Sequence, residues 1–272
     1  MNTTPLGTPR TAVVIPARYA STRFPKKMLV DETGWPLVRH TYERAKLAKL
    51  PARIIIATDD TRIEEAAKAF GAEVMMTDPN HPTGTDRIAE VARHLEDIDL
   101  IVNVQGDEPE IEPEKIDLLI ELFAASNAAM GTLVCRFPAG KFEGPGSPLD
   151  PNCNKVVLGA PVMKPFSDKI LGYDALYFSR SLIPYPRDAA GKFERSEDYF
   201  LHLGIYAYTP DFLQVYVSLP QGKLEVVEKL EQLRVLENGY KIVAGIVPNA
   251  TPGVDTREDY DAFKSRWENM RK

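Results

Sequence analysis

The segment VVIPARYASTRFPKKM, residues 13–28, determines how we interpret the rest of the chain. It begins with the β-branched run 13–15, which is typical of a buried strand and stops at Pro16 because proline cannot continue a sheet ladder. The loop that follows carries four cations, Arg18, Arg23, Lys26 and Lys27. A buried strand that ends in a basic loop places cations and backbone N–H groups at the carboxyl edge of a sheet, where open α/β folds bind ligands. This loop therefore suits a polyphosphate.

A solvated surface is the simpler explanation for several cations in one loop. The loop lacks GxGxxG, and GxxxxGK[ST] occurs nowhere in the chain, so neither standard phosphate-binding fingerprint applies. The net charge of −6 also argues against a general nucleic-acid binder, which needs a net basic face. We therefore expect no nucleic-acid polymer as a partner, and any phosphate binding must be local to this loop.

The composition is that of a soluble globular protein. The chain has 272 residues, of which 44% are hydrophobic and 26% charged. This length is enough for one large α/β domain or two smaller ones. Its two cysteines, Cys135 and Cys153, show no metal-ligand spacing and no disulfide framework. The first ten residues contain no apolar signal region, and no apolar run is long enough to span a bilayer. We expect a cytoplasmic protein without membrane insertion.

Short apolar strands alternate with amphipathic helices in the first part of the chain. The expected strands are residues 12–15, 53–57, 73–76 and 100–104. The expected helices are residues 36–50, a helix opened by a capping box from Thr61 to Glu64 and closed by Gly71, and a helix after the loop 81–87. This alternation predicts an α/β fold with a mostly parallel sheet flanked by helices.

The pattern changes after about residue 135. A Pro/Gly-rich segment, 137–154, precedes the expected strands 155–158, 175–178 and 203–208, so we predict a β-rich insertion at about 136–208 within a single domain, residues 1–272. A helix at 224–237 should bury Val226, Val227, Leu230, Leu233 and Leu236. A last strand, 242–247, precedes a C-terminal helix at about 256–271 that should bury Tyr260, Phe263, Trp267 and Met270.

Carboxylates follow the fourth strand, just as cations follow the first. Gln105, Asp107 and Glu108 lie in this second loop, and the two loops are expected at the same edge of the sheet. Cations that face carboxylates suit a nucleoside triphosphate with Mg²⁺, whose oxygen ligands carboxylates, water and phosphate supply. Turn chemistry explains Asp107 equally well, and Asp255 could simply neighbour an N-cap, because Thr256 and Asp259 can cap the last helix.

Seven motifs then make a family resemblance specific. In chain order they are VVIPARYASTRFP, HPTGTDR, NVQGDEP, ALYFSR, HLGIYAY, LEQLRVL and GVDTRED. In this order the chain resembles the 3-deoxy-manno-octulosonate (Kdo) cytidylyltransferase family, from about residue 13 to residue 260. IPAR is shared with other nucleotidyltransferases, whereas HLGIY together with LEQLRVL is much more particular.

The resemblance implies a Rossmann-like nucleotidyltransferase fold and a reaction. CMP would be transferred from CTP to the anomeric hydroxyl of Kdo, giving CMP-Kdo and pyrophosphate for lipopolysaccharide biosynthesis, with Mg²⁺ required. It also implies a homodimer formed through the β-rich insertion. Two alternatives stay open: activation of another acidic sugar, such as 8-amino-Kdo or a sialic acid, and an inert CTP-binding protein. Retention of Lys27, Asp107 and Asp255 argues against the second.

The resemblance also implies roles for individual residues. The triphosphate loop would use Arg18, Ser21, Arg23 and Lys27, and the cytidine would lie beside Thr83, Gly84, Thr85 and Arg87. Asp107 and Asp255 would hold Mg²⁺ and, with Lys27, act in catalysis. Kdo would be bound by Gln105, His202, Tyr206, Glu231 and Gln232, with Arg180 in support.

Three positions depart from the family pattern. Lys26 replaces a glycine and Met28 a proline after the arginine of the first loop, and Pro82 replaces a glutamine before the cytidine loop. Lys26 adopts a positive φ less readily than glycine, so the path of the loop is open. Pro82 removes a backbone donor near the base.

Overall fold

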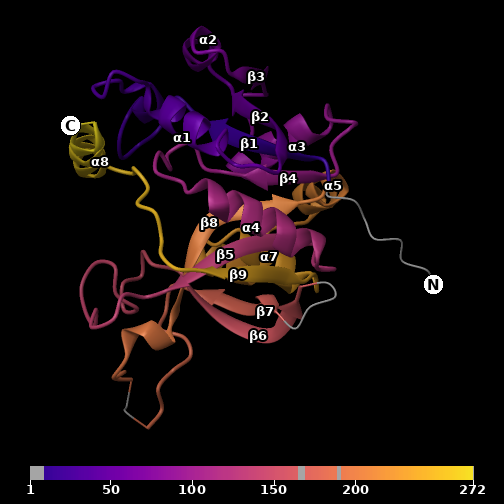
Figure 1. Cartoon of the computed structure of the whole chain (residues 1–272). Helices are drawn as coiled ribbons and strands as arrows, with labels where there is room; N and C mark the ends of the chain where they lie inside the picture. The colour runs from indigo at the N-terminus through magenta and orange to yellow at the C-terminus, as the bar shows by residue number, and fades with distance from the viewer. Residues whose placement is uncertain (1–8, 165–168, 189–190, 272) are drawn as a thin grey trace. The chain divides into compact units, whose positions relative to one another are not determined.

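The strand–helix alternation of the first hundred residues folds as a parallel sheet. The computed structural model describes residues 9–164, 169–188 and 191–271. The chain divides into two units, Met1–Asp117 with Thr251–Lys272, and Leu118–Ala250. The first unit contains β1 (Thr11–Ala17), β2 (Pro51–Thr58), β3 (Glu73–Met76) and β4 (Leu100–Asn103) in the order β3-β2-β1-β4 (Figure 1). Every pairing in it is parallel, which confirms the predicted parallel sheet.

Strand β1 is central in the first unit. All seven of its residues are buried, and it pairs with β2 on one side and β4 on the other. A strand buried on both faces must be apolar throughout, which is why its sequence shows no alternation. Because β1 and β4 run parallel, the loops that follow them leave the same edge of this sheet.

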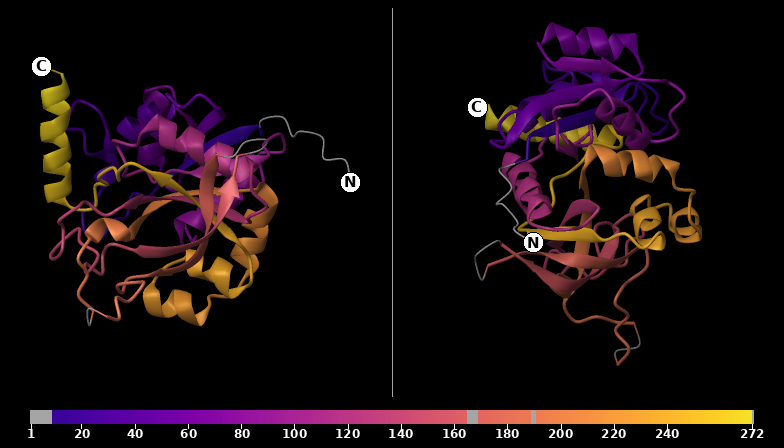
Figure 2. Two further views of the ribbon diagram at one scale, coloured as in Figure 1. Left: turned by 60° about the horizontal axis from the view of Figure 1, so that its bottom comes forward. Right: turned by 90° about the vertical axis from the view of Figure 1, so that its right-hand side faces the viewer.

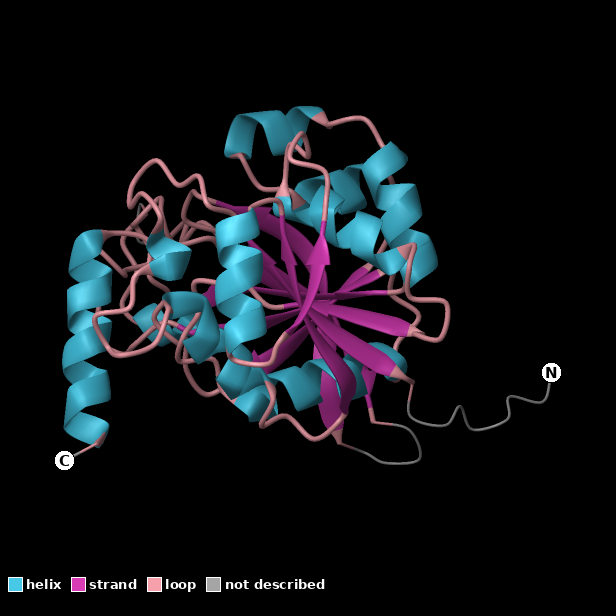
Figure 3. Ribbon diagram, turned by 90° about the horizontal axis from the view of Figure 1, so that it is seen from above, coloured by secondary structure: helices cyan, strands magenta, loops and turns pink. Residues whose placement is uncertain are grey.

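The helices of the first unit are α1 (Leu37–Ala45), α2 (Thr61–Ala69), α3 (Gly84–Ala92) and α8 (Arg257–Met270), with helices flanking the strands in Figure 3. Helix α1 ends earlier than the expected residue 50. The capping box predicted at Thr61 is wrong, because Asp60 is the N-cap and accepts a hydrogen bond from the Arg62 N–H. Thr61 is instead the first helical residue.

An aromatic cluster holds α8 against α1. The His40 ring makes edge contacts with Phe263 and Trp267, at centroid distances of 4.9 and 4.5 Å, and Trp35 lies 5.3 Å away. Figure 2 shows α8 (yellow) beside the indigo segments of its unit. Met270, which was expected to be buried here, is 67% exposed. It lies in the last turn, beyond the reach of this cluster, so the predicted apolar stripe stops at Trp267.

The second unit is rich in antiparallel strands. It contains β5 (Met130–Arg136), β6 (Lys155–Met163), β7 (Ile170–Ser179), β8 (Phe200–Tyr208) and β9 (Ile242–Val247). Their order is β8-β5-β9-β7-β6, and β6 pairs again with β8, so the hydrogen bonding returns to its first strand. Only the β5–β9 pair is parallel among the pairings described within this unit. The β-rich part of the chain is therefore as predicted, with β5 as an additional strand.

Helices α4 (Pro113–Ala124) and α5 (Pro210–Ser218) complete the larger elements, and α4 contains the boundary between the units. In the second unit, Leu119 of α4 packs over Gly131 and Leu122 over Gly245, where an added Cβ would lie 3.2 and 3.1 Å from their side chains, and Leu118 would lie 3.9 Å from a Cβ on Gly245. Two 3₁₀ turns, η1 (Lys27–Leu29) and η2 (Ser196–Asp198), complete the described elements. Among the described residues, no helix is long and apolar enough to cross a membrane.

The helix expected at 224–237 is two short helices. Helix α6 (Lys223–Glu228) ends at Lys229, whose φ of 55° is left-handed, and α7 (Gln232–Glu237) begins after it. The break changes which face is buried. Val226 and Val227 are 45% and 81% exposed, contrary to the prediction, whereas Leu230 and Leu233 are buried as expected.

The buried position of His40 gives a pH dependence of stability. Burial, followed by the charges of Arg39 and Arg271, lowers the pKa of His40 from 6.5 to about 4. The unfolded chain therefore binds this proton first as the pH falls, so stability is present above about pH 6.5 and is lost towards pH 4. We expect the free energy of unfolding of His40→Phe, measured in urea, to fall less steeply across this range than that of the wild type, by up to about 1.4 kcal/mol per pH unit. Parallel curves would contradict this assignment.

Candidate active site

The loop after β1 is anchored by one aromatic side chain. Phe24 packs in a buried cluster with Leu37, Tyr260, Phe263 and Val254, the residue that precedes Asp255 in the sequence. Its ring meets the Tyr260 ring edge-on at 5.9 Å. Lys27 lies three residues after this anchor, in the turn η1, where its N–H donates to the Phe24 carbonyl. The hydrophobic core therefore fixes the backbone on which the basic loop is built.

Lys26 adopts the backbone conformation that glycine would favour. Its φ of 63° and ψ of 16° are left-handed, and its carbonyl accepts from the Leu29 N–H at 2.9 Å. A lysine in this conformation carries conformational strain that a glycine would not. The Lys26 side chain points into solvent, whereas that of Lys27 is buried.

The loop after β4 approaches β1 closely at Gly106. A Cβ on Gly106 would lie 2.9 Å from the Pro16 carbonyl oxygen and 3.2 Å from the Met28 sulfur. Thr41 of α1 donates its hydroxyl to the Gly106 carbonyl at 2.9 Å. This close approach requires glycine, and it places Asp107 directly opposite the basic loop.

The Lys27 ammonium joins three segments of the first unit. Its Nζ lies 2.6 Å from Asp107 Oδ2, 3.2 Å from Asp255 Oδ1 and 3.0 Å from the Val254 carbonyl oxygen. The Lys27 side chain is only 9% exposed, whereas those of Asp107 and Asp255 are 25% and 50% exposed. The residues predicted to act in catalysis therefore meet around one nitrogen atom.

Backbone contacts bring the two carboxylates together independently of Lys27. The Val254 N–H donates to the Asp107 carbonyl at 2.8 Å. Thr256 and Asp259 form the capping box predicted at the start of α8, and the Asp255 N–H also donates to the Asp259 carboxylate at 3.1 Å. Asp255 therefore neighbours the N-cap Thr256, and its carboxylate also lies in the cluster.

A cavity of about 380 Å³ lies over this cluster, entirely within the first unit. Eight of the predicted site residues line it: Arg18, Ser21, Arg23, Lys27, Gly84, Gln105, Asp107 and Asp255. The remaining lining residues are Pro16, Ala20, Thr22, Met28 and Gly106. Arg23 also pairs with Asp255 Oδ1 at 3.0 Å. The cavity is lined by cations and carboxylates from three loops, as a metal-bound triphosphate requires.

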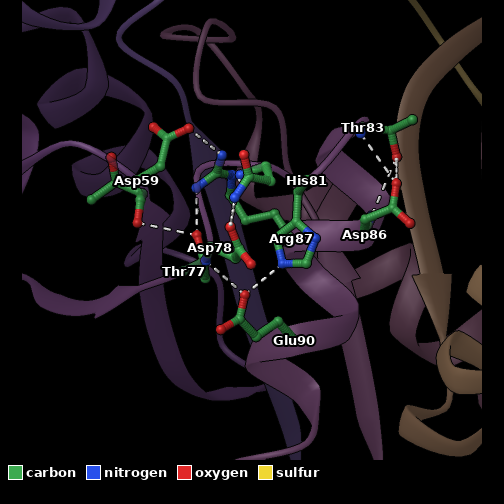
Figure 4. Close-up of polar contacts among 10 residues, drawn as sticks. Asp59, Thr77, Asp78, His81, Thr83, Asp86, Arg87 and Glu90 are labelled. Carbon is green, nitrogen blue, oxygen red and sulfur yellow. Dashed lines mark hydrogen bonds and ion pairs between the residues drawn. The ribbon is translucent and has the colours of Figure 1, made fainter.

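The loop before α3 contributes to the cavity mainly through Gly84. Thr83 caps α3 in a capping box with Asp86, so its hydroxyl is already hydrogen-bonded (Figure 4). The Pro82 carbonyl accepts from Arg18 Nη1 at 3.3 Å, which links this loop to the basic loop. Thr85 is buried and does not line the cavity.

Arg87 is fully buried and joins two strand ends. Its guanidinium donates to the Asp59 carboxylate at 2.6 Å and to the Thr77 hydroxyl (Figure 4). Asp59 follows β2 and Thr77 follows β3, so Arg87 ties α3 to the edge of the sheet. Its contacts favour a structural contribution to the predicted cytidine site, through the position of α3.

Glu108 lies next to the site, and the GDEP motif alone does not reveal the charge of its carboxyl group. Desolvation, followed by the Asp107 carboxylate, raises the pKa of Glu108 to about 8, and Lys115 opposes this shift. At neutral pH Glu108 is therefore mostly protonated. Burial is a tertiary property, so this difference between adjacent carboxyl groups has no signature in the sequence.

The donor set fits a magnesium ion. Two carboxylates lie around a position that a cationic nitrogen occupies, and Mg²⁺ is bound by one or two carboxylates with waters and phosphate oxygens. The described residues contain no group of three or more His, Cys, Asp or Glu side chains suited to a metal ion. A site with only two protein carboxylates depends on the nucleotide for its remaining ligands.

Three residues predicted to bind the sugar meet in the second unit. His202 Nε2 lies 3.0 Å from Thr132 Oγ1, and His202 Nδ1 lies 3.4 Å from Gln232 Nε2. The Tyr206 ring is 5.5 Å from the imidazole. The Thr132 hydroxyl donates to the Ile205 carbonyl at 2.8 Å, so it must accept from His202 Nε2–H, which leaves Nδ1 to accept from the Gln232 amide.

His202 is neutral in this network. Desolvation lowers the pKa of His202 to about 3, because the ring is buried and no carboxylate pairs with it among the described contacts. Its hydrogen bonds fix the orientation of Gln232 at the start of α7. Sequence reasoning did not identify Thr132, which lies on the unpredicted strand β5.

Glu231 immediately precedes α7, and the turn that carries it is held by buried polar contacts. Tyr216 donates its hydroxyl to the Glu231 carbonyl at 3.3 Å. Arg234 stacks on the Tyr216 ring at 4.6 Å and pairs with Glu225 through hydrogen bonds of 2.6 and 2.8 Å. Arg180 reaches the same turn, donating to the Glu228 carbonyl at 2.6 Å.

Comparison with known proteins shows the family of this chain. The cytidylyltransferase family model matches residues 12–242. The chain belongs to the cytidylyltransferase family. It is 45% identical over 252 residues to the 3-deoxy-manno-octulosonate cytidylyltransferase of Syntrophobacter fumaroxidans, covering 92% of this chain and 93% of that protein. The resemblance to Kdo cytidylyltransferases is thereby confirmed.

A second group of relatives has a different name. The 8-amino-3,8-dideoxy-manno-octulosonate cytidylyltransferase of Shewanella sediminis is 43% identical over 259 residues, covering 93% of this chain and 97% of that protein. Among solved structures, a CMP:2-keto-3-deoxy-manno-octonic acid synthetase complexed with CTP aligns with a TM-score of 0.83 and 38% identity. The alignment covers 96% of this cytidylyltransferase and 99% of that chain, which confirms the predicted nucleotidyltransferase fold.

The left-handed conformation of Lys26 gives a stability prediction. A residue with a Cβ in this region costs about 1–2 kcal/mol, whereas glycine adopts it freely but loses about 0.5–1 kcal/mol through the entropy of the unfolded chain. We expect Lys26→Gly to raise the free energy of unfolding by about 0.5–1 kcal/mol in urea, with an unchanged m-value. A Lys26→Gly protein less stable than the wild type would show that the turn is not strained.

Proposed function

We propose that this cytidylyltransferase transfers CMP from CTP to the anomeric hydroxyl of Kdo, giving CMP-Kdo and pyrophosphate for lipopolysaccharide biosynthesis. The observation that carries the proposal is the cluster in which Lys27 meets Asp107 and Asp255 under a cavity lined by the basic loop. The names of the relatives supply the acceptor, because Kdo or its 8-amino analogue occurs in each of those described above.

The triphosphate is the part of the substrates that this cavity suits best. Arg18, Arg23 and Lys27 place positive charge at one edge of the sheet in a protein whose net charge is −6. These cations would offset the charge that develops on the pyrophosphate as its bond to the α-phosphorus breaks. Ser21 and the backbone N–H groups of the loop add hydrogen-bond donors.

We include Mg²⁺ in the proposal, held by Asp107 and Asp255. When bound, the ion neutralises phosphate oxygens and fixes the triphosphate for in-line attack. Asp107 is the stronger candidate ligand, because it is less exposed and because Gly106 sets its position against β1. Asp255 follows a residue buried in the core, so its carboxylate is also held in place.

The acceptor part of the proposal rests on the second unit. Kdo is a polyhydroxy acid, so several donors and acceptors in fixed positions are needed to bind it. Gln232 and Tyr206 surround the neutral imidazole of His202, and Glu231 lies at the adjacent turn. A neutral imidazole avoids adding a charge beside the hydroxyls, while the Glu231 carboxylate can accept hydrogen bonds from them.

The substrate assay tests the proposal directly. With CTP, Mg²⁺ and Kdo, the purified protein should release pyrophosphate, measured by a coupled phosphate assay, and CMP-Kdo should appear by mass spectrometry. Asp107→Asn, which keeps the size of the side chain, should lower kcat at least about 100-fold because the carboxylate charge is lost. Turnover with 8-amino-Kdo or a sialic acid, without turnover of Kdo, would assign the protein to another acidic sugar.

A second prediction separates acceptor binding from nucleotide binding. Glu231→Gln should raise KM for Kdo about 10- to 100-fold, because a hydrogen bond to a charged group is lost, while KM for CTP stays within about twofold. Glu65→Gln, at an exposed position of α2, is the charge-matched control and should leave both values unchanged. Equal effects on the two KM values would remove Glu231 from the acceptor site.

We extend the proposal to a cytoplasmic homodimer formed through the β-rich part of the chain. Large apolar side chains are exposed there, with Ile170 and Leu176 of β7 at 51% and 58% and Val227 of α6 at 81%. Exposed apolar groups of this size favour a covered surface. Gly159 of β6 leaves room for the Leu176 side chain, whose Cδ2 would lie 2.7 Å from a Cβ at this position.

A further inference from the structure

The Lys27 ammonium lies where a cation bound by both carboxylates would lie. Its Nζ is within 3.2 Å of one oxygen of Asp107 and one oxygen of Asp255. The same nitrogen donates to the Val254 carbonyl at 3.0 Å, which gives it a third anchor outside the carboxylates. Three oxygens around one buried ammonium group satisfy its three donors.

The backbone holds the carboxylates close whether or not Lys27 is present. Val254 donates its N–H to the Asp107 carbonyl at 2.8 Å, and the Asp255 N–H donates to the Asp259 carboxylate. Two carboxylates that both lie within hydrogen-bonding distance of one atom repel each other unless that atom carries a positive charge. Lys27 relieves this repulsion in the nucleotide-free protein from a side chain that is only 9% exposed. Arg23 also pairs with Asp255 Oδ1 at 3.0 Å, but its side chain is 66% exposed and the described contacts do not join it to Asp107.

We propose that Lys27 is the built-in counter-ion of the metal carboxylates, and that a divalent cation must displace its ammonium to bind them. This inference rests on the proposed metal role of Asp107 and Asp255. The displaced ammonium group becomes available to the triphosphate, because Lys27 lines the same cavity as Arg18 and Ser21. Metal binding and triphosphate binding are then coupled through one side chain.

The coupling means that removal of the ammonium changes metal affinity and CTP affinity in opposite directions. Without nucleotide, the tethered ammonium competes with a divalent cation, so the protein should bind metal weakly on its own. Removing the ammonium should strengthen metal binding and weaken CTP binding at the same time. A residue that only supports the fold would weaken both when it is removed.

The test uses Mn²⁺ as the probe in the absence of nucleotide, with free Mn²⁺ measured by electron paramagnetic resonance. Lys27→Met and Lys27→Gln should each bind Mn²⁺ at least about tenfold more tightly than the wild type, because a positive charge close to the ion is removed. Both variants should bind CTP, titrated without metal in a calorimeter, at least about tenfold more weakly. The glutamine can still donate to the Val254 carbonyl, so Lys27→Gln covers the case in which Lys27→Met does not fold.

Lys26→Met is the matched control for charge. It removes one positive charge from the neighbouring position, but its side chain is exposed and the described contacts place it at neither carboxylate. Its Mn²⁺ affinity should equal that of the wild type. The double variant with Asp107→Asn and Lys27→Gln should show no gain in Mn²⁺ affinity, and this result would identify the carboxylates as the ligands.

Two results would overturn the inference. One is unchanged or weaker Mn²⁺ binding by both Lys27 variants, and the other is an equal gain in Lys26→Met. Pyrophosphate release by the wild type with CTP and Kdo tests the proposed function separately, because the Mn²⁺ titration contains neither substrate. An active enzyme whose Lys27 variants gain no Mn²⁺ affinity would therefore keep its proposed function and lose only this inference.

Discussion

The contact of one ammonium group with two carboxylates and a backbone carbonyl is the interaction on which the first unit of this protein is centred. Lys27 comes from the loop after β1, Asp107 from the loop after β4, and Asp255 from the segment before α8. These segments are more than two hundred residues apart at the extremes. The ammonium can lie between them only because Phe24 and Val254 enter the same core cluster and because Gly106 allows the loop after β4 to approach Pro16 of β1. Apolar packing and a close backbone contact thus position the charges.

The predicted site residues of the second unit are held by hydrogen bonds around a neutral imidazole and not by contacts between opposite charges. Its central titratable group, His202, is neutral because it is desolvated, and its two nitrogens are committed to Thr132 and Gln232. The turn between α6 and α7 is held by the buried pair of Glu225 with Arg234. A polyhydroxylated acceptor is recognised by many directional hydrogen bonds, which require fixed neutral donors and acceptors, whereas a triphosphate is recognised mainly through its charge.

The parallel sheet of the first unit was predictable because each strand is a short apolar run between turn residues, and β3 matches its predicted bounds, as does β9 of the second unit. The expected stop at Pro16 is wrong, because β1 continues through it to Ala17. The errors came from features that sequence periodicity does not encode. Asp60, and not Thr61, is the N-cap of α2, because the backbone geometry at the end of β2 determines which residue caps the helix. The helix at 224–237 breaks at Lys229 because the Glu225–Arg234 pair and the contacts of Glu228 hold two short helices separately.

The sequence by itself determined the family and the parallel sheet, and it singled out the residues that meet around Lys27, since these follow from motifs and strand patterns that are local in the chain. Only the tertiary structure decided the contacts and the charge of other side chains near the predicted sites. It buried Arg87 against Asp59, raised the pKa of Glu108 and made His202 neutral. The physical reason is that burial and the distance between charges depend on contacts between segments far apart in the chain, whereas a motif records only which residue types are present.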